Sequence, residues 1–233
     1  MKKTVLIFIV LLMATAMVID GCAKQAASPA SLSASQIIEK SSEKMQAINS
    51  FHFALDQVGG GTPIAMGIEM KKADGDVVRP DKLKMTISGT VSGMSLEVQM
   101  ITIGGVMYMT NPLSGKWELP PAEFKVLSVL DPNAFIATVM KNVTGLTELN
   151  DEESAGVICY HLSGSISSDD LSAITGSSVK GVAINIEIWI GKDDLLVRNI
   201  KVTGKITETE VQGIVRTLNF SNYNEAVKIE LPE

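Results

Sequence analysis

The stretch from Lys82 to Thr110 reads KLKMTISGTVSGMSLEVQMITIGGVMYMT. Apolar residues occupy every second position from Leu83 to Ile87 and again from Met94 to Met100, with Lys, Thr, Ser, Glu and Gln between them. Gly104 and Gly105 then turn the chain into a third apolar run, 106–109. A period of two with turn residues between the runs predicts an antiparallel meander that has one apolar and one wet face.

The same alternation continues on both sides of this stretch. Adding the three runs above to the others gives about ten strands, which we expect near residues 51–55, 64–71, 83–88, 94–100, 106–109, 157–163, 184–190, 196–202, 214–220 and 227–229. Gly191-Lys192-Asp193-Asp194 has the composition of a hairpin turn between two of them.

Four short segments have helical spacing instead. We expect a helix over 34–49 that starts with a capping box from Ser33 to Gln36. Two more are predicted over 121–130 and 132–141, since each begins at proline, and a fourth over 169–175, capped by Ser168. The fold class is therefore α+β, with one domain over 34–233. Four short helices are too few to cover ten strands, so the sheet curls on itself or part of its face borders something else.

The N-terminus has the order of an export signal. Lys2 and Lys3 precede an apolar run, Val5–Ile19, which is shorter than the roughly 20 residues of a membrane-spanning helix. The run ends in Ile19-Asp20-Gly21-Cys22, which resembles a bacterial lipobox, although Asp20 replaces the usual small or aliphatic residue.

The lipobox implies cleavage after Gly21, so that residues 1–21 are a lipoprotein signal peptide and Cys22 is the lipidation site. Residues 22–33 then form the acylated cysteine and a flexible tether. We expect a bacterial protein that is lipid-anchored at the extracytoplasmic face of the cell membrane, held by two acyl chains. The alternative is an ordinary signal peptide with an incidental cysteine.

Composition argues against a nucleic-acid partner and against an intramolecular disulfide. The formal net charge is −6 and the chain has no Lys/Arg cluster, which argues against nucleic acid as a partner. Cys159 is the one cysteine besides Cys22, so once Cys22 is acylated no intramolecular disulfide can form. Cys159 lies in an apolar run and is expected to be a buried small hydrophobe.

No catalytic or metal-binding pattern is present. The two histidines, His52 and His161, lie in predicted strands far apart, and zinc, calcium, phosphate-loop and nucleophile-elbow motifs are missing. We therefore predict no enzyme activity, no catalytic residues, no metal and no cofactor. A Ser–His–Asp site assembled from distant residues is the remaining hydrolase alternative.

Methionine is concentrated in one part of the chain. Of nine methionines after Cys22, seven lie in 66–109. Methionine adapts to irregular apolar surfaces, which suits a hollow that takes an apolar guest, although gap filling in an ordinary core explains the count as well. A rigid empty hollow of ~1,000 Å³ would cost ~24 kcal/mol, more than the ~5–15 kcal/mol that stabilises a domain. We expect any hollow to hold ligand or to collapse partly.

The chain also resembles a known family, the LppX/LprA/LprF/LprG lipoproteins of the mycobacterial cell envelope. The resemblance spreads over most of the chain after Cys22 and lies in the order and spacing of Lys44–Phe53, Gly105–Tyr108, Gly115–Trp117, Leu130–Pro132, His161–Ser167, Ile188–Ile190, Leu218–Tyr223 and Val227–Ile229.

This resemblance implies a strongly bent antiparallel sheet, a half-barrel with a few helices on its concave face, similar to the LolA/LolB carriers. It implies a hydrophobic cavity for acylated lipid or glycolipid, carriage of that lipid within the envelope, and an envelope transporter as a partner. Its motifs transfer no site residues, so the predicted cavity set comes from the apolar pattern alone: Met66, Met85, Met94, Leu96, Val98, Met100, Leu127, Leu130, Phe135, Ile136 and Val139. The alternative function is a non-transport envelope sensor or scaffold that binds a protein.

Overall fold

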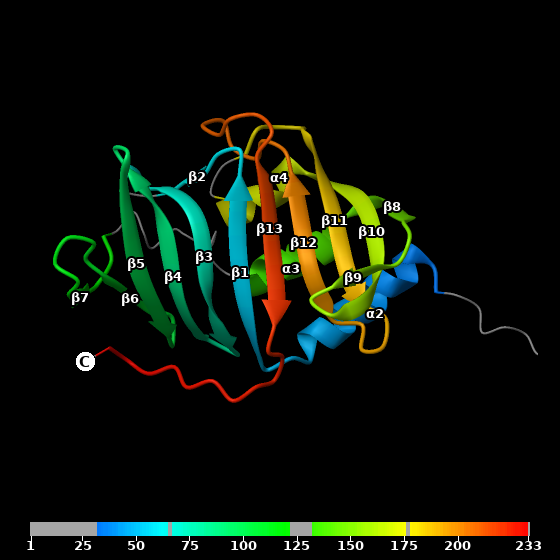
Figure 1. The fold of residues 1–233 in the computed structure, drawn as a ribbon, viewed down its shortest axis with the longest axis horizontal. Coiled ribbons are helices and arrows are strands. Elements are labelled where there is room, and N and C mark those ends of the chain that lie inside the picture. Colours follow the sequence, from blue (N-terminus) through cyan, green and yellow to red (C-terminus); the bar gives the residue numbers. More distant parts are fainter. Residues whose placement is uncertain (1–31, 65–66, 122–131, 176–177, 233) are drawn as a thin grey trace, which may run out of the picture. The chain divides into compact units, whose positions relative to one another are not determined.

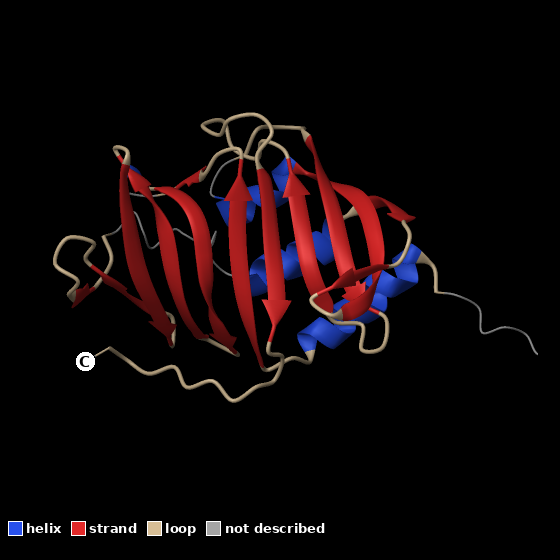
Figure 2. Ribbon diagram, viewed as in Figure 1, coloured by secondary structure: helices blue, strands red, loops and turns tan. Residues whose placement is uncertain are grey.

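The computed structural model of the chain describes residues 32–64, 67–121, 132–175 and 178–232. Within these residues one antiparallel sheet carries thirteen strands, and eleven of them follow the order β7-β6-β5-β4-β3-β1-β13-β12-β11-β10-β8. The short strands β2 and β9 pair with β3 and β10. The sheet is open, since β7 and β8 are its two ends, and it bends around three helices (Figures 1 and 2).

The strand bounds follow the chain in order. They are β1 (Ser50–Val58), β2 (Thr62–Pro63), β3 (Glu69–Val78), β4 (Lys82–Val91), β5 (Met94–Ile103), β6 (Val106–Thr110), β7 (Trp117–Glu118), β8 (Thr144–Glu148), β9 (Glu152–Ser154), β10 (Val157–Ser167), β11 (Ala183–Gly191), β12 (Val197–Thr203) and β13 (Val215–Ser221).

The helices are α2 (Ala34–Gln46), α3 (Pro132–Asn142) and α4 (Ser168–Thr175). The predicted capping box of α2 is confirmed, because Ser33 Oγ accepts from the Gln36 backbone N–H over 3.3 Å and Gln36 Oε1 accepts from the Ser33 N–H over 2.9 Å. The predicted apolar stripes are confirmed as well, as Ile37 and Met45 of α2 and Val139 of α3 are buried.

All three helices lie on one face of the sheet, behind the strands β1 and β8–β13 in the view of Figure 2. α3 packs against α2, α4 and β10, while α2 packs against β8 and α4 against β10. No described helix lies over β4–β7 (Figure 1). The helices thus cover one half of the sheet, which agrees with the expectation that they are too few for the whole.

The first and last strands meet in the middle of the sheet. β1 pairs β13 from His52–Ser221 to Val58–Val215. Phe51 and Phe220 lie on the helix side with their rings edge to face at 6.0 Å. This pairing joins a half built from β1–β7 to a half built from β8–β13, so both halves contribute to one hydrophobic core.

A buried ion pair fixes the loop between β12 and β13. The Arg216 guanidinium contacts the Glu210 carboxylate, and Glu210 Oε2 also accepts from the N–H groups of Ile206 (2.7 Å) and Thr207 (3.2 Å). Thr62 Oγ1 accepts from Arg216 Nε over 3.3 Å, which connects the loop to β2. Burial lowers the pKa of Arg216, and the Glu210 carboxylate opposes that shift.

The structure corrects the predicted elements in three places. Residues 227–229 form no strand, because the segment after Ser221 leaves the sheet and runs past the strand ends (Figure 1). Of the predicted strand 64–71, residues 69–71 lie in β3, whereas Ile64, Gly67 and Ile68 lie in no strand and residues 65–66 fall outside the described residues. The short strands β2, β7, β8 and β9 were not expected. The helix predicted over 121–130 falls almost wholly on residues 122–131, outside the described residues.

Candidate functional site

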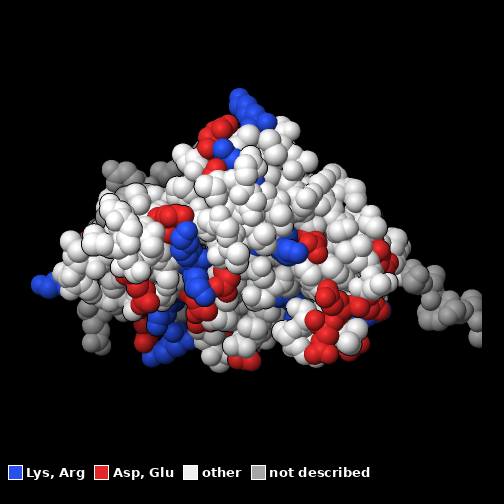
Figure 3. All heavy atoms as spheres, turned by 45° about the horizontal axis from the view of Figure 1, so that its top comes forward, with Lys and Arg blue, Asp and Glu red and all other residues white. Residues whose placement is uncertain are grey.

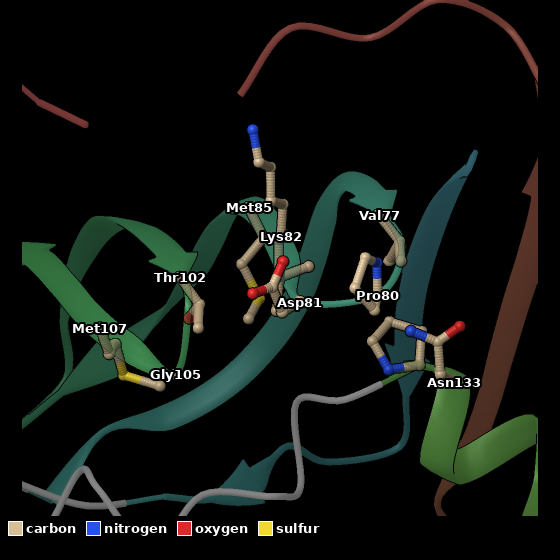
Figure 4. A pocket seen from close by; sticks show the side chains of 11 residues that line it. Val77, Pro80, Asp81, Lys82, Met85, Thr102, Gly105, Met107 and Asn133 are labelled. Atoms are coloured by element: carbon tan, nitrogen blue, oxygen red, sulfur yellow. The ribbon is translucent and has the colours of Figure 1, made fainter. Parts of the chain in front are cut away.

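A cavity of about 230 Å³ lies between the N-terminal end of α3 and the adjoining ends of β3–β6 (Figure 4). It opens to the surface. Its lining residues are Val77, Pro80, Asp81, Lys82, Leu83, Met85, Thr102, Gly105, Met107, Pro132 and Asn133. The lining is mostly apolar, with the polar side chains of Asp81, Lys82, Thr102 and Asn133 among it.

Strand register explains why these residues meet. Val77 of β3 pairs with Leu83 of β4, Leu83 with Thr102 of β5, and Thr102 with Met107 of β6. Since register partners point to the same face, the four side chains form one row across the sheet. This outer row is the sheet side of the cavity.

A second row lies one step further from the strand ends. Met85, Met100 and Met109 are register partners across β4, β5 and β6, and all three are buried. Gly75 of β3 completes the row beside Met85, and a Cβ on it would stand 2.6 Å from Met85 Cβ and 2.3 Å from the Lys84 carbonyl oxygen. Only glycine leaves that space to the methionine. Behind the outer row, the wall is therefore made of flexible thioether side chains.

Arg79 connects the β3–β4 turn to α2 and α3 beside the cavity through hydrogen bonds. Its Nη1 donates to the carbonyl oxygens of Met45 (2.9 Å) and Gln46 (2.7 Å) at the end of α2. Its Nε donates to Asn133 Oδ1 over 3.0 Å at the start of α3. A cation near these carbonyls also complements the negative end of the α2 dipole. The turn between β3 and β4 thus holds both helix ends at the rim.

The predicted cavity residues are dispersed by the structure. Met85 alone lines the described cavity, while Val98, Met100, Ile136 and Val139 are buried in the core. Leu96 and Phe135 are partly buried against that core. Met94 is 67% exposed beside the β4–β5 turn. Met66, Leu127 and Leu130 lie outside the described residues, so the set as a whole stays a prediction.

Sequence reasoning missed most of the lining, including Met107, Leu83 and Val77. Met107 and Leu83 occupy apolar positions of predicted strands, so the alternation predicted that their side chains lie on the apolar face of the sheet. The alternation did not predict which of these side chains lie near α3. The one available signal was the helix start at Pro132, which packing places at the cavity.

A second hollow of about 400 Å³ lies where β8, β10 and β11 meet, lined by Gly145, Ser163, Gly164, Ser165, Asn185, Ile186 and Glu187. It is wide open, and polar and apolar atoms contribute about equally to its lining. The pKa of Glu187 is lowered, chiefly because the Lys201 ammonium donates a hydrogen bond to it over 2.8 Å, although burial acts in the opposite direction.

The two histidines have carboxylate partners. His52 Nδ1 lies 2.9 Å from Asp76 Oδ1, and His161 Nε2 lies 3.1 Å from Glu187 Oε2. Neither ring bonds a serine, threonine or cysteine side chain in the part of the chain described, and no group of three His, Cys, Asp or Glu residues there could hold a metal ion. The carboxylate contacts account for the position of both imidazole rings as parts of polar pairs within the sheet.

Surface and hydropathy add two findings. On the face shown in Figure 3, acidic and basic residues lie next to each other on the left, acidic residues gather at the lower right, and wide areas carry no charge. Within the described ranges, no helix combines the length and the apolar character needed to span a bilayer.

Sequence comparison identifies related proteins over nearly the whole fold. The sequence model of the LppX_LprAFG lipoprotein family matches residues 33–229. The chain is 24% identical over 235 residues to the lipoarabinomannan carrier protein LprG of Mycobacteroides abscessus, covering 100% of this chain and 99% of that protein. It is 21% identical over 199 residues to lipoprotein LprA of Mycobacterium tuberculosis, covering 78% and 80%.

Two solved structures have the same fold. LprF from Mycobacterium bovis superposes with a TM-score of 0.63 at 18% identity, covering 85% of this chain and 96% of LprF. LppX from Mycobacterium tuberculosis gives 0.62 at 18% identity, covering 84% and 98%. The predicted fold class, an open bent antiparallel sheet with a few helices on one face, is confirmed.

Proposed function

Because the chain belongs to the LppX_LprAFG lipoprotein family, we propose that it binds the acyl chains of a lipid or glycolipid and carries that lipid within the cell envelope. The observation that carries this proposal is the cavity at the start of α3, with a mainly apolar outer row, a methionine row behind it and polar side chains in its lining. Its chemistry suits an amphipathic guest whose tail enters and whose head group stays in water.

The size of the cavity defines how a tail would enter. A dry apolar cavity of about 150 Å³ is enough to bind benzene, and ligand sites usually measure about 300–1,000 Å³. At about 230 Å³ the cavity takes the first part of a tail, and the rest requires widening. We propose that α3 moves outward from the sheet, and that Met85, Met100 and Met109 change rotamer to accept the tail.

The energies permit this widening. Adding about 150 Å³ of empty apolar space would cost about 4 kcal/mol. Five methylenes that leave water contribute about 4 kcal/mol in return. The hollow therefore opens together with its guest, and longer tails are held more tightly than short ones.

The test is lipid retention by the full chain. Protein purified in mild detergent is extracted with organic solvent and the extract is examined by mass spectrometry, while a fluorescent fatty acid measures binding directly. Met107→Trp fills the outer row and should weaken binding by about ten-fold or more. Met94→Trp, at an exposed position outside the cavity, should leave it unchanged.

Two results would overturn the proposal. One is a protein that carries no lipid and binds no fatty acid at any chain length, above all if a stable protein partner co-purifies with it, as the sensor alternative requires. The other is unchanged binding in a folded Met107→Trp chain, folding being judged by its urea midpoint.

A further inference from the structure

Exposed apolar side chains gather in one hairpin beside the cavity. The rim hairpin, residues 106–119, comprises β6, the loop 111–116, β7 and Leu119, which follows β7. Leu113, in the loop, is 96% exposed. Leu119, directly after β7, is 60% exposed, and Val106, the first residue of β6, is 46% exposed. Single exposed apolar residues such as Val58 occur elsewhere and need no explanation. Three of them fall within the fourteen residues of this hairpin, and this local concentration calls for an explanation.

The loop that carries Leu113 is held in shape by its own hydrogen bonds. Asn111 Oδ1 accepts from the N–H groups of Leu113 (2.9 Å) and Ser114 (3.1 Å), and the Asn111 N–H donates to the Lys116 carbonyl oxygen (2.8 Å). Gly115 supplies the left-handed conformation at φ +69°, where other residues are strained. Leu113 is thus presented in water on an ordered turn, so its contact with a partner costs little further entropy.

The composition around the patch suits one class of partner. Trp117 is half-buried and follows the exposed Lys116. Tryptophan and lysine are the side chains that settle at the boundary between lipid and water, since each combines an apolar body with a polar end. β7 is an edge strand of two residues, too short to pair with a strand of another protein. The chemistry therefore favours a bilayer over a protein.

The rim hairpin is continuous with the cavity mouth. Gly105 directly precedes it and Met107 lies in β6, and both line the cavity (Figure 4). Leu113 and Met107 thus belong to one hairpin, with the loop at its tip and the cavity at its base. A surface that receives the tip brings the mouth toward the same surface.

We propose that the rim hairpin docks on the lipid bilayer. Leu113 and Leu119 enter the interface, Trp117 and Lys116 settle at its boundary, and the mouth is brought to the membrane from which a lipid tail enters. The biological role of this contact rests on the proposed carrier function, whereas the contact of the hairpin with the bilayer can be tested without it.

The two tryptophans of the chain give a direct measurement, since one lies in the hairpin and the other does not. Trp189→Phe leaves Trp117 as the only reporter. Trp117→Phe leaves Trp189, which lies on β11, stacks on His161 at 4.2 Å and donates to Glu152 Oε2 over 2.8 Å. Each full-length variant is reconstituted into vesicles of phosphatidylcholine with brominated acyl chains, which quench nearby tryptophan.

We expect brominated lipid to quench Trp117 strongly and Trp189 hardly at all. Adding Leu113→Asp to the Trp117 reporter should reduce the docked fraction by about ten-fold or more, because one leucine side chain leaves the bilayer. Leu113→Met retains an apolar side chain and should retain the quenching. An unquenched Trp117, or equal quenching in Leu113→Asp and its parent, would overturn the inference. Far-UV circular dichroism checks that Leu113→Asp is folded.

A fatty-acid titration without vesicles separates this inference from the proposed function. If Leu113→Asp binds free fatty acid normally but loses Trp117 quenching, both stand. If Trp117 is quenched and no fatty acid binds at all, the hairpin still docks and the carrier function fails. If brominated lipid does not quench Trp117 and a protein partner co-purifies with the chain, the exposed apolar residues of the hairpin contact that protein, and the bilayer inference is wrong.

Discussion

Arg79 Nε donates to Asn133 Oδ1 over 3.0 Å, so a turn of the sheet holds the first residues of α3 directly. The same guanidinium reaches the last carbonyls of α2. We expect Arg79→Ala to lower the free energy of unfolding by about 1–3 kcal/mol, since it removes several hydrogen bonds to a charged group. Urea unfolding measures this change.

Arg79 also bears on lipid exchange. If α3 must move for a tail to enter, Arg79→Ala should release a bound fluorescent fatty acid faster than the wild-type chain at equal temperature. Lys84→Ala removes a cation of β4 that is exposed and outside the cavity lining, and it serves as the control. Equal release rates in the two variants would show that the Arg79–Asn133 contact plays no part in opening.

The buried pair Arg216–Glu210 predicts a large and asymmetric effect. Glu210→Ala leaves the guanidinium buried without its partner and should cost about 3–5 kcal/mol in unfolding free energy. Glu208→Ala removes an exposed carboxylate 4.0 Å from Lys205 and should change stability by less than about 1 kcal/mol. Two variants of equal stability in urea would contradict the role assigned to the pair.

Glu187 predicts a dependence on pH. Its folded pKa lies below the ordinary value of 4.5, chiefly through the Lys201 hydrogen bond. The unfolded chain therefore binds a proton first, and the stability that Glu187 contributes is present above about pH 4.5 and is lost as the pH falls through the lowered pKa. Glu187→Gln should flatten the unfolding free energy over this acidic range, while a slope identical to that of the wild-type chain would refute the prediction.

Cys159 should be inert in the native protein. It is fully buried, and desolvation raises the pKa of its thiol, so little reactive thiolate is present near neutral pH. We expect a maleimide to label the peptide containing Cys159 slowly in buffer and rapidly in urea, as followed by mass spectrometry. Rapid labelling in buffer would show that the β9–β10 region opens far more often than the fold suggests.

Cys22 supplies a prediction that depends on sequence alone. The lipobox pattern predicts that the wild-type chain partitions into the detergent phase of a Triton X-114 extraction, because two acyl chains are attached. Cys22→Ser should partition into the aqueous phase. A wild-type chain without the added lipid mass on its N-terminal peptide would support the ordinary signal peptide instead.

Much of the sheet was predictable because apolar and polar residues alternate along most of the longer strands. The apolar runs around Met85, Met100 and Ile188 gave their strands and buried faces correctly. The error at Val227–Ile229 has the opposite cause. Ile229 is buried like a strand residue, yet its segment lies beside the strand ends, where Asn224 N–H donates to the Ser50 carbonyl oxygen over 2.8 Å. Alternation reports burial on one side and says nothing of pairing.

The short strands escaped prediction for a related reason. β7, which begins at Trp117, has two residues, and β9, which begins at Glu152, has three. Segments this short cannot show an alternation of apolar and polar residues. Their conformation is imposed by the neighbouring strand, since Thr110 pairs with Trp117 and Cys159 with Glu152. A two-residue strand has no pattern of its own to find.

The sequence by itself determined local elements: the period of the longer strands, the cap of α2 and the start of α3 at Pro132. Tertiary structure decided which elements meet. The pairing of β1 with β13 joins residues more than 150 positions apart in the sequence. It thereby connects the half of the sheet that contains the methionine strands to the half built from β8–β13. The cavity at α3 exists only after that pairing, because no local pattern encodes the distance between Met107 and Asn133. Local propensity acts over a few residues, whereas a cavity forms from long-range packing.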